Sequence, residues 1–202
     1  DVGVFETGGD LVRPGGSSAG QMRFGNQKND SGFSAHGGPV NVAFGSLATP
    51  ESLTWQSGSF NWGNYALILN YTDADNTLDF KNDVSFGSTN REVRVDATNV
   101  AAVATMSGVL SASTAGVGFE KQGVGHLVLA GLNTYTGDTV VSGGTLTVAD
   151  DAQLKFEIGA SGVNNAITGG GTINLNGDFL FDLTGAGSTV GDMWSIVDVD
   201  NL

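Results

Sequence analysis

The sequence predicts an all-β protein whose short strands stack into a solenoid, and three observations lead to that prediction. Within residues 118–151, four short alternations of apolar and polar residues are separated by turns rich in Gly, Asn, Thr and Asp. This pattern is typical of half-buried strands. Leu127 and Leu129 recur as Leu146 and Val148 after 19 residues, a spacing that suits one coil of a stacked solenoid. No run with helical periodicity interrupts these segments.

Residues 1–38 are the least regular part of the chain. Residues 2–5 form a short candidate strand, and Gly8-Gly9 and the Pro-Gly-Gly-Ser-Ser run at 14–18 then break the alternation. We expect an N-terminal cap or a loosely wound first coil here, because an open solenoid end exposes unpaired strand groups and apolar core.

From Gly37 onward, apolar and polar residues alternate in short segments bounded by Gly, Asn, Asp or Pro. In the segment 93–97, this alternation directs Val93 and Val95 inward and places Arg94 and Asp96 on the solvent side. The strands expected before the regular stretch are residues 40–44, 53–55, 67–71, 78–80, 93–97, 102–106 and 109–110.

The regular stretch and the chain after it continue the same period of two. Strands are expected at residues 119–121, 127–129, 139–141 and 146–148, and then at 154–158, 173–175, 179–183 and 194–197. The three glycines at 169–171 predict a turn.

Residues 118–151 also resemble a known repeat. Residues 121–129 read KQGVGHLVL, residues 133–139 read NTYTGDT, and residues 143–148 read GGTLTV. They resemble the autotransporter-associated β-strand repeat, or passenger-associated transport repeat, of bacterial surface proteins, which reads K-x-G-x-G-x-L-x-L-x-G-x-N-x-Y-x-G-x-T followed by G-x-L. His126 replaces a usual Thr or Ser, and Asp138 a usual Gly. The resemblance implies a right-handed parallel β-helix, secreted or on a bacterial cell surface, and implies no reaction.

Length and composition exclude several classes of protein. The 202 residues suit a single β-solenoid domain with the repeat at 118–151 inside it. A net charge of −13 repels nucleic acid and anionic membrane surfaces. The chain has no cysteine, which removes disulfides and thiol nucleophiles. No run approaches the roughly 20 apolar residues of a membrane span, so we expect no membrane insertion of this chain.

Two acidic segments are candidates for calcium. Asp73 and Asp75, and likewise Asp198 and Asp200, stand in a D-x-D-N pattern that offers carboxylate and amide oxygens, the ligands that calcium prefers. Asp and Asn also cap their own backbone in turns without any metal. We therefore expect no obligatory cofactor, with calcium as the open alternative.

Aromatic residues give a candidate site for sugars. Trp55, Trp62 and Tyr65 fall within eleven residues, and aromatic faces of this kind stack on sugar rings. The alternative is that Trp55 fills the solenoid interior.

No catalytic residues are predicted. His36 and His126 stand 90 positions apart in Gly-flanked turns, and the chain lacks the strand-to-helix nucleophile elbow of Ser hydrolases. We predict a non-enzymatic structural or adhesive module that contacts cell-surface proteins or glycans. The alternatives are a filament subunit that binds copies of itself end to end and a polysaccharide-active β-helix enzyme.

Overall fold

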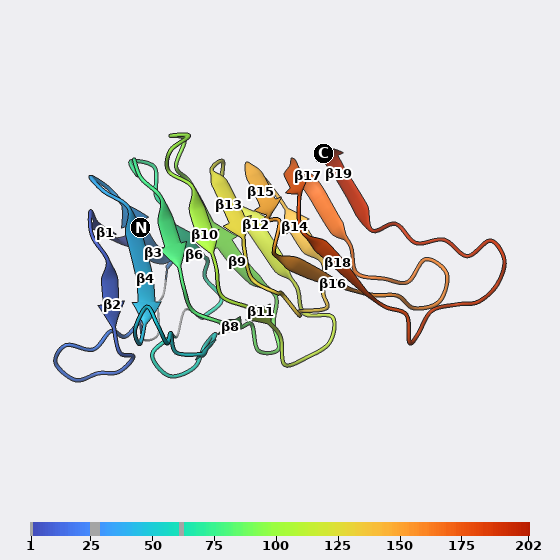
Figure 1. The fold of residues 1–202 in the computed structure, drawn as a ribbon, viewed down its shortest axis with the longest axis horizontal. Helices are drawn as coiled ribbons and strands as arrows, with labels where there is room; N and C mark the ends of the chain where they lie inside the picture. Colours follow the sequence, from blue (N-terminus) through green and yellow to red (C-terminus); the bar gives the residue numbers. More distant parts are fainter. Residues whose placement is uncertain (1, 25–28, 61–62) are drawn as a thin grey trace.

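The computed structural model describes residues 2–24, 29–60 and 63–202, which form β-strands joined by turns. Figure 1 shows the strands stacked side by side along one long axis. In the described residues, no helix is long and apolar enough to cross a membrane. The strands are β1 Gly3–Thr7, β2 Leu11–Arg13, β3 Ser31–Ala35, β4 Val40–Phe44, β5 Leu53–Thr54, β6 Leu67–Leu69, β7 Leu78–Phe80, β8 Val84–Ser85, β9 Arg91–Arg94, β10 Ala104–Met106, β11 Leu110–Ser111, β12 Phe119–Gln122, β13 His126–Leu129, β14 Thr139–Val141, β15 Thr145–Val148, β16 Gln153–Glu157, β17 Ile167–Leu175, β18 Asp178–Asp182 and β19 Val197–Asn201.

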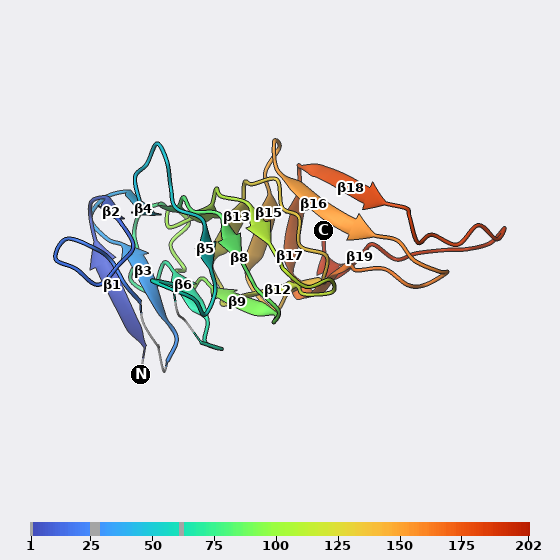
Figure 2. The ribbon, with the colours of Figure 1, turned by 90° about the horizontal axis from the view of Figure 1, so that it is seen from below.

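The strands line three faces of a parallel β-helix. The first face runs β1-β3-β6-β9-β12-β14 and continues through the start of β17 to β19. The second runs β2-β4-β7-β10-β13-β15 and ends on the second half of β17. The third contains β5-β8-β11 and, further along the axis, β16-β18 (Figure 2). All pairings between these strands are parallel, as a solenoid requires, so the predicted fold class is confirmed.

The predicted coil spacing is confirmed. Leu127 pairs with Leu146 and Leu129 pairs with Val148, one coil further along the second face. Within the described part of residues 1–38, β1 pairs with β3 and β2 pairs with β4. The proposed boundaries of the cap, the domain and the repeat remain predictions.

The turn expected at residues 169–171 is wrong. These glycines lie inside β17, which pairs with β14 at Ile167 and with β15 from Thr172 onward. Gly169 has a φ of 118°, and a Cβ on it would lie 2.4 Å from the carbonyl oxygen of Val141. The glycines therefore let one strand bend from the first face to the second while staying against the coil beneath. The last strand also differs, since β19 begins at Val197 and the expected strand at 194–197 is displaced.

Aromatic rings fill the N-terminal two thirds of the interior. Phe44, Phe60 and Phe80 are fully buried and pack with centroids 5.9 to 6.5 Å apart. Val93 and Val95 point inward as predicted. Asp96 was expected on the solvent side, but it is only 8% exposed. The ion pair between Arg94 Nε and Asp96 Oδ2, at 2.8 Å, compensates that burial.

Buried asparagines satisfy the backbone where coils turn a corner. Asn82, which follows β7, accepts a hydrogen bond from Phe44 N at 2.9 Å. Its amide donates to Phe44 O and Glu51 O, both at 2.8 Å. Asn70 acts in the same way on Ala35 N at 2.9 Å, in a left-handed conformation with φ 68° that asparagine tolerates. Each asparagine side chain thus supplies hydrogen bonds to backbone groups that lack a strand partner at the turn.

Replacing Asn82 by alanine tests this role. Asn82→Ala leaves Phe44 N and Glu51 O without their hydrogen-bond partner, while Phe44 O keeps the amide of Glu51, so we expect the free energy of unfolding to fall by about 2 kcal/mol. Urea denaturation measures the change. Asn99→Ala is the control, because Asn99 makes a solvent-exposed turn bond to Ala101 N, and we expect it to cost less than about 1 kcal/mol. Equal losses in the two variants would contradict the role.

Close stacking also fixes Gly118. A Cβ at Gly118 would lie 2.2 Å from the carbonyl oxygen of Asp138 in the next coil. We expect Gly118→Ala to lower the free energy of unfolding by about 2 kcal/mol, because the coils must move apart. Gly9→Ala is the matched control, since nothing lies within 4 Å of the added atom, and we expect it to change stability by less than about 0.5 kcal/mol. Thermal unfolding of both variants decides the point.

Candidate functional site

The structure separates the aromatic residues that the sequence grouped. Trp55 is 2% exposed, and its ring packs 5.3 Å from that of Phe60. It fills the interior and offers no face to a sugar, which agrees with the alternative stated for it above. Tyr65 is 40% exposed. Trp62 lies outside the described residues, so the sugar-stacking hypothesis keeps Tyr65 as its described residue.

The four aspartates proposed for calcium do not converge. Asp75 Oδ1 accepts hydrogen bonds from Gly37 N at 2.7 Å and from Asn76 Nδ2 at 2.8 Å, which cap the local turn. Those bonds lower the pKa of Asp75. Asp198 and Asp200 lie on β19, in the last coil. Within residues 2–24, 29–60 and 63–202, no three acidic or histidine side chains gather as a metal site. Calcium binding stays a prediction.

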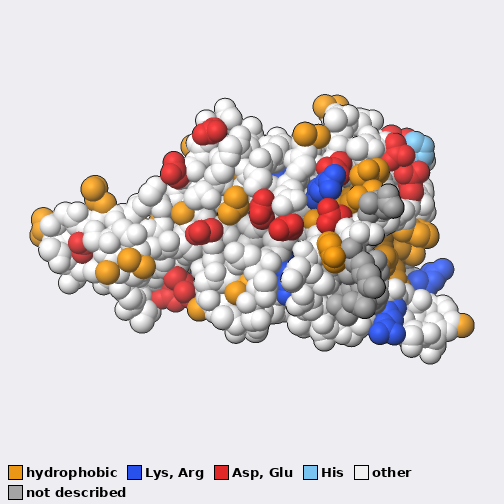
Figure 3. Space-filling model, turned by 180° about the vertical axis from the view of Figure 1, so that it is seen from behind, with side chains coloured by type: hydrophobic (Ala, Val, Ile, Leu, Met, Phe, Trp, Pro, Cys, Tyr) orange, Lys and Arg blue, Asp and Glu red, His pale blue; other side chains and the backbone are white. Residues whose placement is uncertain are grey.

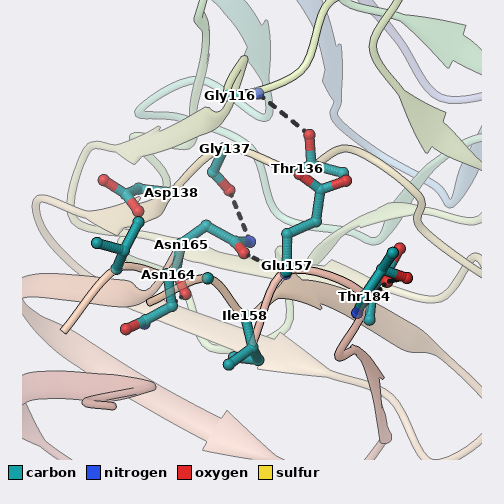
Figure 4. A pocket seen from close by; sticks show the side chains of 13 residues that line it. Gly116, Thr136, Gly137, Asp138, Glu157, Ile158, Asn164, Asn165 and Thr184 are labelled. Atoms are coloured by element: carbon teal, nitrogen blue, oxygen red, sulfur yellow. Dashed lines mark hydrogen bonds between the residues drawn. The ribbon is translucent and has the colours of Figure 1, made fainter. Parts of the chain in front are cut away.

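A groove of about 570 Å³ lies in the C-terminal half of the described part of the chain. It is lined by residues from the loops around β14, β16 and β18. Figure 4 shows side chains from three successive coils directed into this space. The lining includes Gly137, Asp138, Glu157, Asn165, Asp182 and Thr184.

Asn165 holds the floor of the groove together. Its Oδ1 accepts from Glu157 N at 2.7 Å, and its amide donates to Gly137 O at 3.2 Å and to Lys155 O at 2.9 Å. The bond to Gly137 is visible in Figure 4. One side chain thereby fixes the distance between two coils, so the groove is preformed.

Carboxylates make the groove acceptor-rich. Lys155 Nζ lies 3.1 Å from Asp182 Oδ2 and 3.4 Å from Glu157 Oε1, and these bonds raise the pKa of Lys155. The hydroxyl and amide of Thr184, together with Lys155, lower the pKa of Asp182 to about 2. Asp138 Oδ1 accepts from Ala166 N at 2.8 Å. Three carboxylates line the groove and Lys155 pairs with two of them, so the groove favours ligands that donate hydrogen bonds, such as hydroxyl or amino groups.

Comparison with known proteins finds similarity for coils that contribute residues to the groove. Residues 119–148, which run from β12 through β15, match the family model of the passenger-associated-transport-repeat. This part of the chain is therefore similar to that repeat. The chain is also 37% identical over 93 residues, 45% of its length, to the adhesin BmaC autotransporter of Brucella suis biovar 1 (strain 1330), and the match spans 2% of that protein. No solved structure matches the chain.

The passenger repeat contains a buried cation that sequence reasoning missed. Lys121 is 0% exposed, and its Nζ donates to the carbonyls of Gln122 at 3.0 Å, Gly123 at 2.6 Å and Gly143 at 2.9 Å. All three ammonium protons are used, and they join one coil of the repeat to the next. Lys121 stands two residues after the buried Phe119 on β12. That period of two was the available signal that it points inward.

The pH dependence of stability tests the burial of Lys121. Burial lowers its pKa to about 8, from 10.5 in the unfolded chain. Between these values the unfolded chain holds a proton that the folded chain has released, so the free energy of unfolding contributed by Lys121 rises with pH. We expect Lys121→Met to be less stable than wild type by about 2 kcal/mol at pH 7, because the carbonyls of Gly123 and Gly143 lose a charged donor and that of Gln122 keeps only the amide of Val95. The gap should widen from pH 8 toward 10.5, as measured by urea unfolding. A gap that stays level or narrows would contradict the shift.

Proposed function

We propose that this chain is a non-enzymatic, adhesive β-helix module displayed on or released from a bacterial cell. The observation that carries the proposal is the passenger-associated repeat at residues 119–148, whose four strands occupy two successive coils in register. The resemblance to an adhesin over 93 residues supports the adhesive part. Neither similarity points to the filament subunit or the polysaccharide-active enzyme left open by the sequence.

The proposed mechanism is geometric. Stacked coils satisfy the backbone between neighbours and hold the loops of one side at fixed spacing. A partner with several hydroxyl or amino groups would find fixed acceptors in the groove, above all the carboxylates of Asp138 and Glu157. Preformed acceptors lose little conformational entropy on binding, which favours adhesion through repeated weak contacts.

Adhesion of coated beads tests the function. Beads carrying the purified chain should bind cultured host cells more than beads carrying an unrelated acidic protein. The double variant Asp138→Asn/Glu157→Gln should reduce binding at least about threefold, since it removes two charged acceptors and keeps their shapes. Asp150→Asn/Asp151→Asn is the charge-matched control, because both residues are exposed in a turn away from the groove, and it should bind like wild type. No binding above the unrelated protein would overturn the proposal.

A further inference from the structure

Arg91, the first residue of β9, is a buried cation held by neutral groups. It is 3% exposed, and its guanidinium carbon lies 5.6 Å from the centroid of the Trp55 ring. Its Nε donates to Phe86 O at 2.9 Å, Nη1 to Gly63 O at 3.0 Å, and Nη2 to Gln56 Oε1 at 3.2 Å. These contacts fix the plane of the guanidinium.

The charge of Arg91 is uncompensated within the described part of the chain. None of its acceptors is a carboxylate, and no described Asp or Glu forms an ion pair with it. Burial consequently lowers its pKa. A guanidinium has five N–H donors, so each terminal nitrogen keeps one donor without an acceptor among the described residues. Lys121, the other buried cation, uses all its donors. Arg91 therefore has unused capacity for an anion.

A small pocket lies against Arg91. The pocket holds about 180 Å³ and is lined by Asn64, Tyr65, Thr89, Asn90, Arg91 and Glu92. Asn64 Oδ1 accepts from Gln56 Nε2, and Asn90 Oδ1 accepts from Gly118 N, both at 2.8 Å. With their oxygens occupied, the two side-chain amides offer N–H donors. Tyr65, 40% exposed, adds an aromatic ring at the same place.

Glu92 borders the pocket but belongs to the outer surface of β9. Strand residues alternate in direction, so Glu92 points away from the side of Arg91. It stands in register with Glu120 of the next coil. Burial and the nearby Glu120 and Asp30 raise the pKa of Glu92. Glu92 is thus the acidic residue in the described lining of the pocket.

We propose that this pocket binds the carboxylate of a single acidic sugar, which pairs with Arg91 while its ring stacks on Tyr65. A guanidinium recognises a carboxylate through paired charge-assisted hydrogen bonds, and an aromatic ring beside amide donors suits a pyranose better than a phosphate ion. The volume of about 180 Å³ fits one sugar unit. A polyanion is disfavoured, because the chain carries a net charge of −13. This site is separate from the groove of the proposed function.

Titration with free sugars tests the proposal without any adhesion assay. The isotopically labelled full chain is titrated with glucuronate, with N-acetylneuraminate and with neutral glucose, and NMR shifts are followed. At least one acid should bind at least about tenfold more tightly than glucose and should shift signals of Asn64, Tyr65, Asn90 and Arg91 Nε. The acid that binds more tightly distinguishes a uronate source from a sialylated one. Equal binding of acids and glucose, or shifts confined to other residues, would overturn the proposal.

Variants separate a binding role from a structural one. Arg91→Gln should weaken acid binding at least about tenfold, whereas Arg13→Gln, at an exposed arginine, should leave it unchanged. If Arg91→Gln does not fold, Tyr65→Ala decides, because Tyr65 is partly exposed and its loss should cost at least about threefold in affinity with the fold intact. Wild-type affinity in Tyr65→Ala sinks the proposal. If coated beads adhere but the chain binds no acidic sugar, the adhesive function stands and this site is rejected. If the chain binds an acidic sugar but the beads do not adhere, this site stands and the adhesive function is rejected.

Discussion

Parallel stacking of coils is the constraint on which the rest of this structure depends. Each strand takes its backbone partners from the coil before and the coil after, so the ladder works only while every coil keeps the same path. Where the chain turns from one face to the next, the ladder stops and buried carbonyls and amides lose their partners. Asn82 and Lys121 both lie next to such corners and both donate to carbonyls of the adjoining coil. The buried polar side chains are therefore part of the stacking.

The same constraint explains the glycines at contacts between coils. A side chain at Gly118 or Gly169 would meet a carbonyl oxygen of the neighbouring coil at 2.2 or 2.4 Å. Coils separated by such contacts cannot shift independently, so a loop on one coil is held in place by the coil beneath. This stacking also determines the shape of the groove, in which Asn165 hydrogen-bonds to two coils. The stacking makes the surface rigid although the sequence is rich in glycine. This rigid surface is the physical basis of the proposed adhesive function.

The sequence predicted where the strands lie and how they pair better than it predicted which charged residues are buried. Alternation located β12 to β15 and the pairing of Leu127 with Leu146, because apolar side chains report directly on the buried side. It misplaced Asp96, and it did not predict that Lys121 and Arg91 are buried, since charged residues are rarely buried without a partner. Their partners are backbone carbonyls, which no side-chain pattern reveals. The groove was likewise invisible, because its residues come from three coils and meet only when the coils stack.

Burial of cations also changes the charge that a partner meets. The chain has 8 basic and 21 acidic residues, and two of the basic ones, Lys121 and Arg91, are buried. The outer surface is accordingly more acidic than the composition alone indicates. Figure 3 shows acidic side chains along the length of one face, with basic ones mainly toward its N-terminal end.

Long-range repulsion would keep polyanions away from such a surface. A single carboxylate is repelled far less, and at the pocket over β9 it would meet a guanidinium that the fold leaves without a counter-charge among the described residues. The contrast between an acidic exterior and one accessible buried cation would select small acidic groups over long anionic chains.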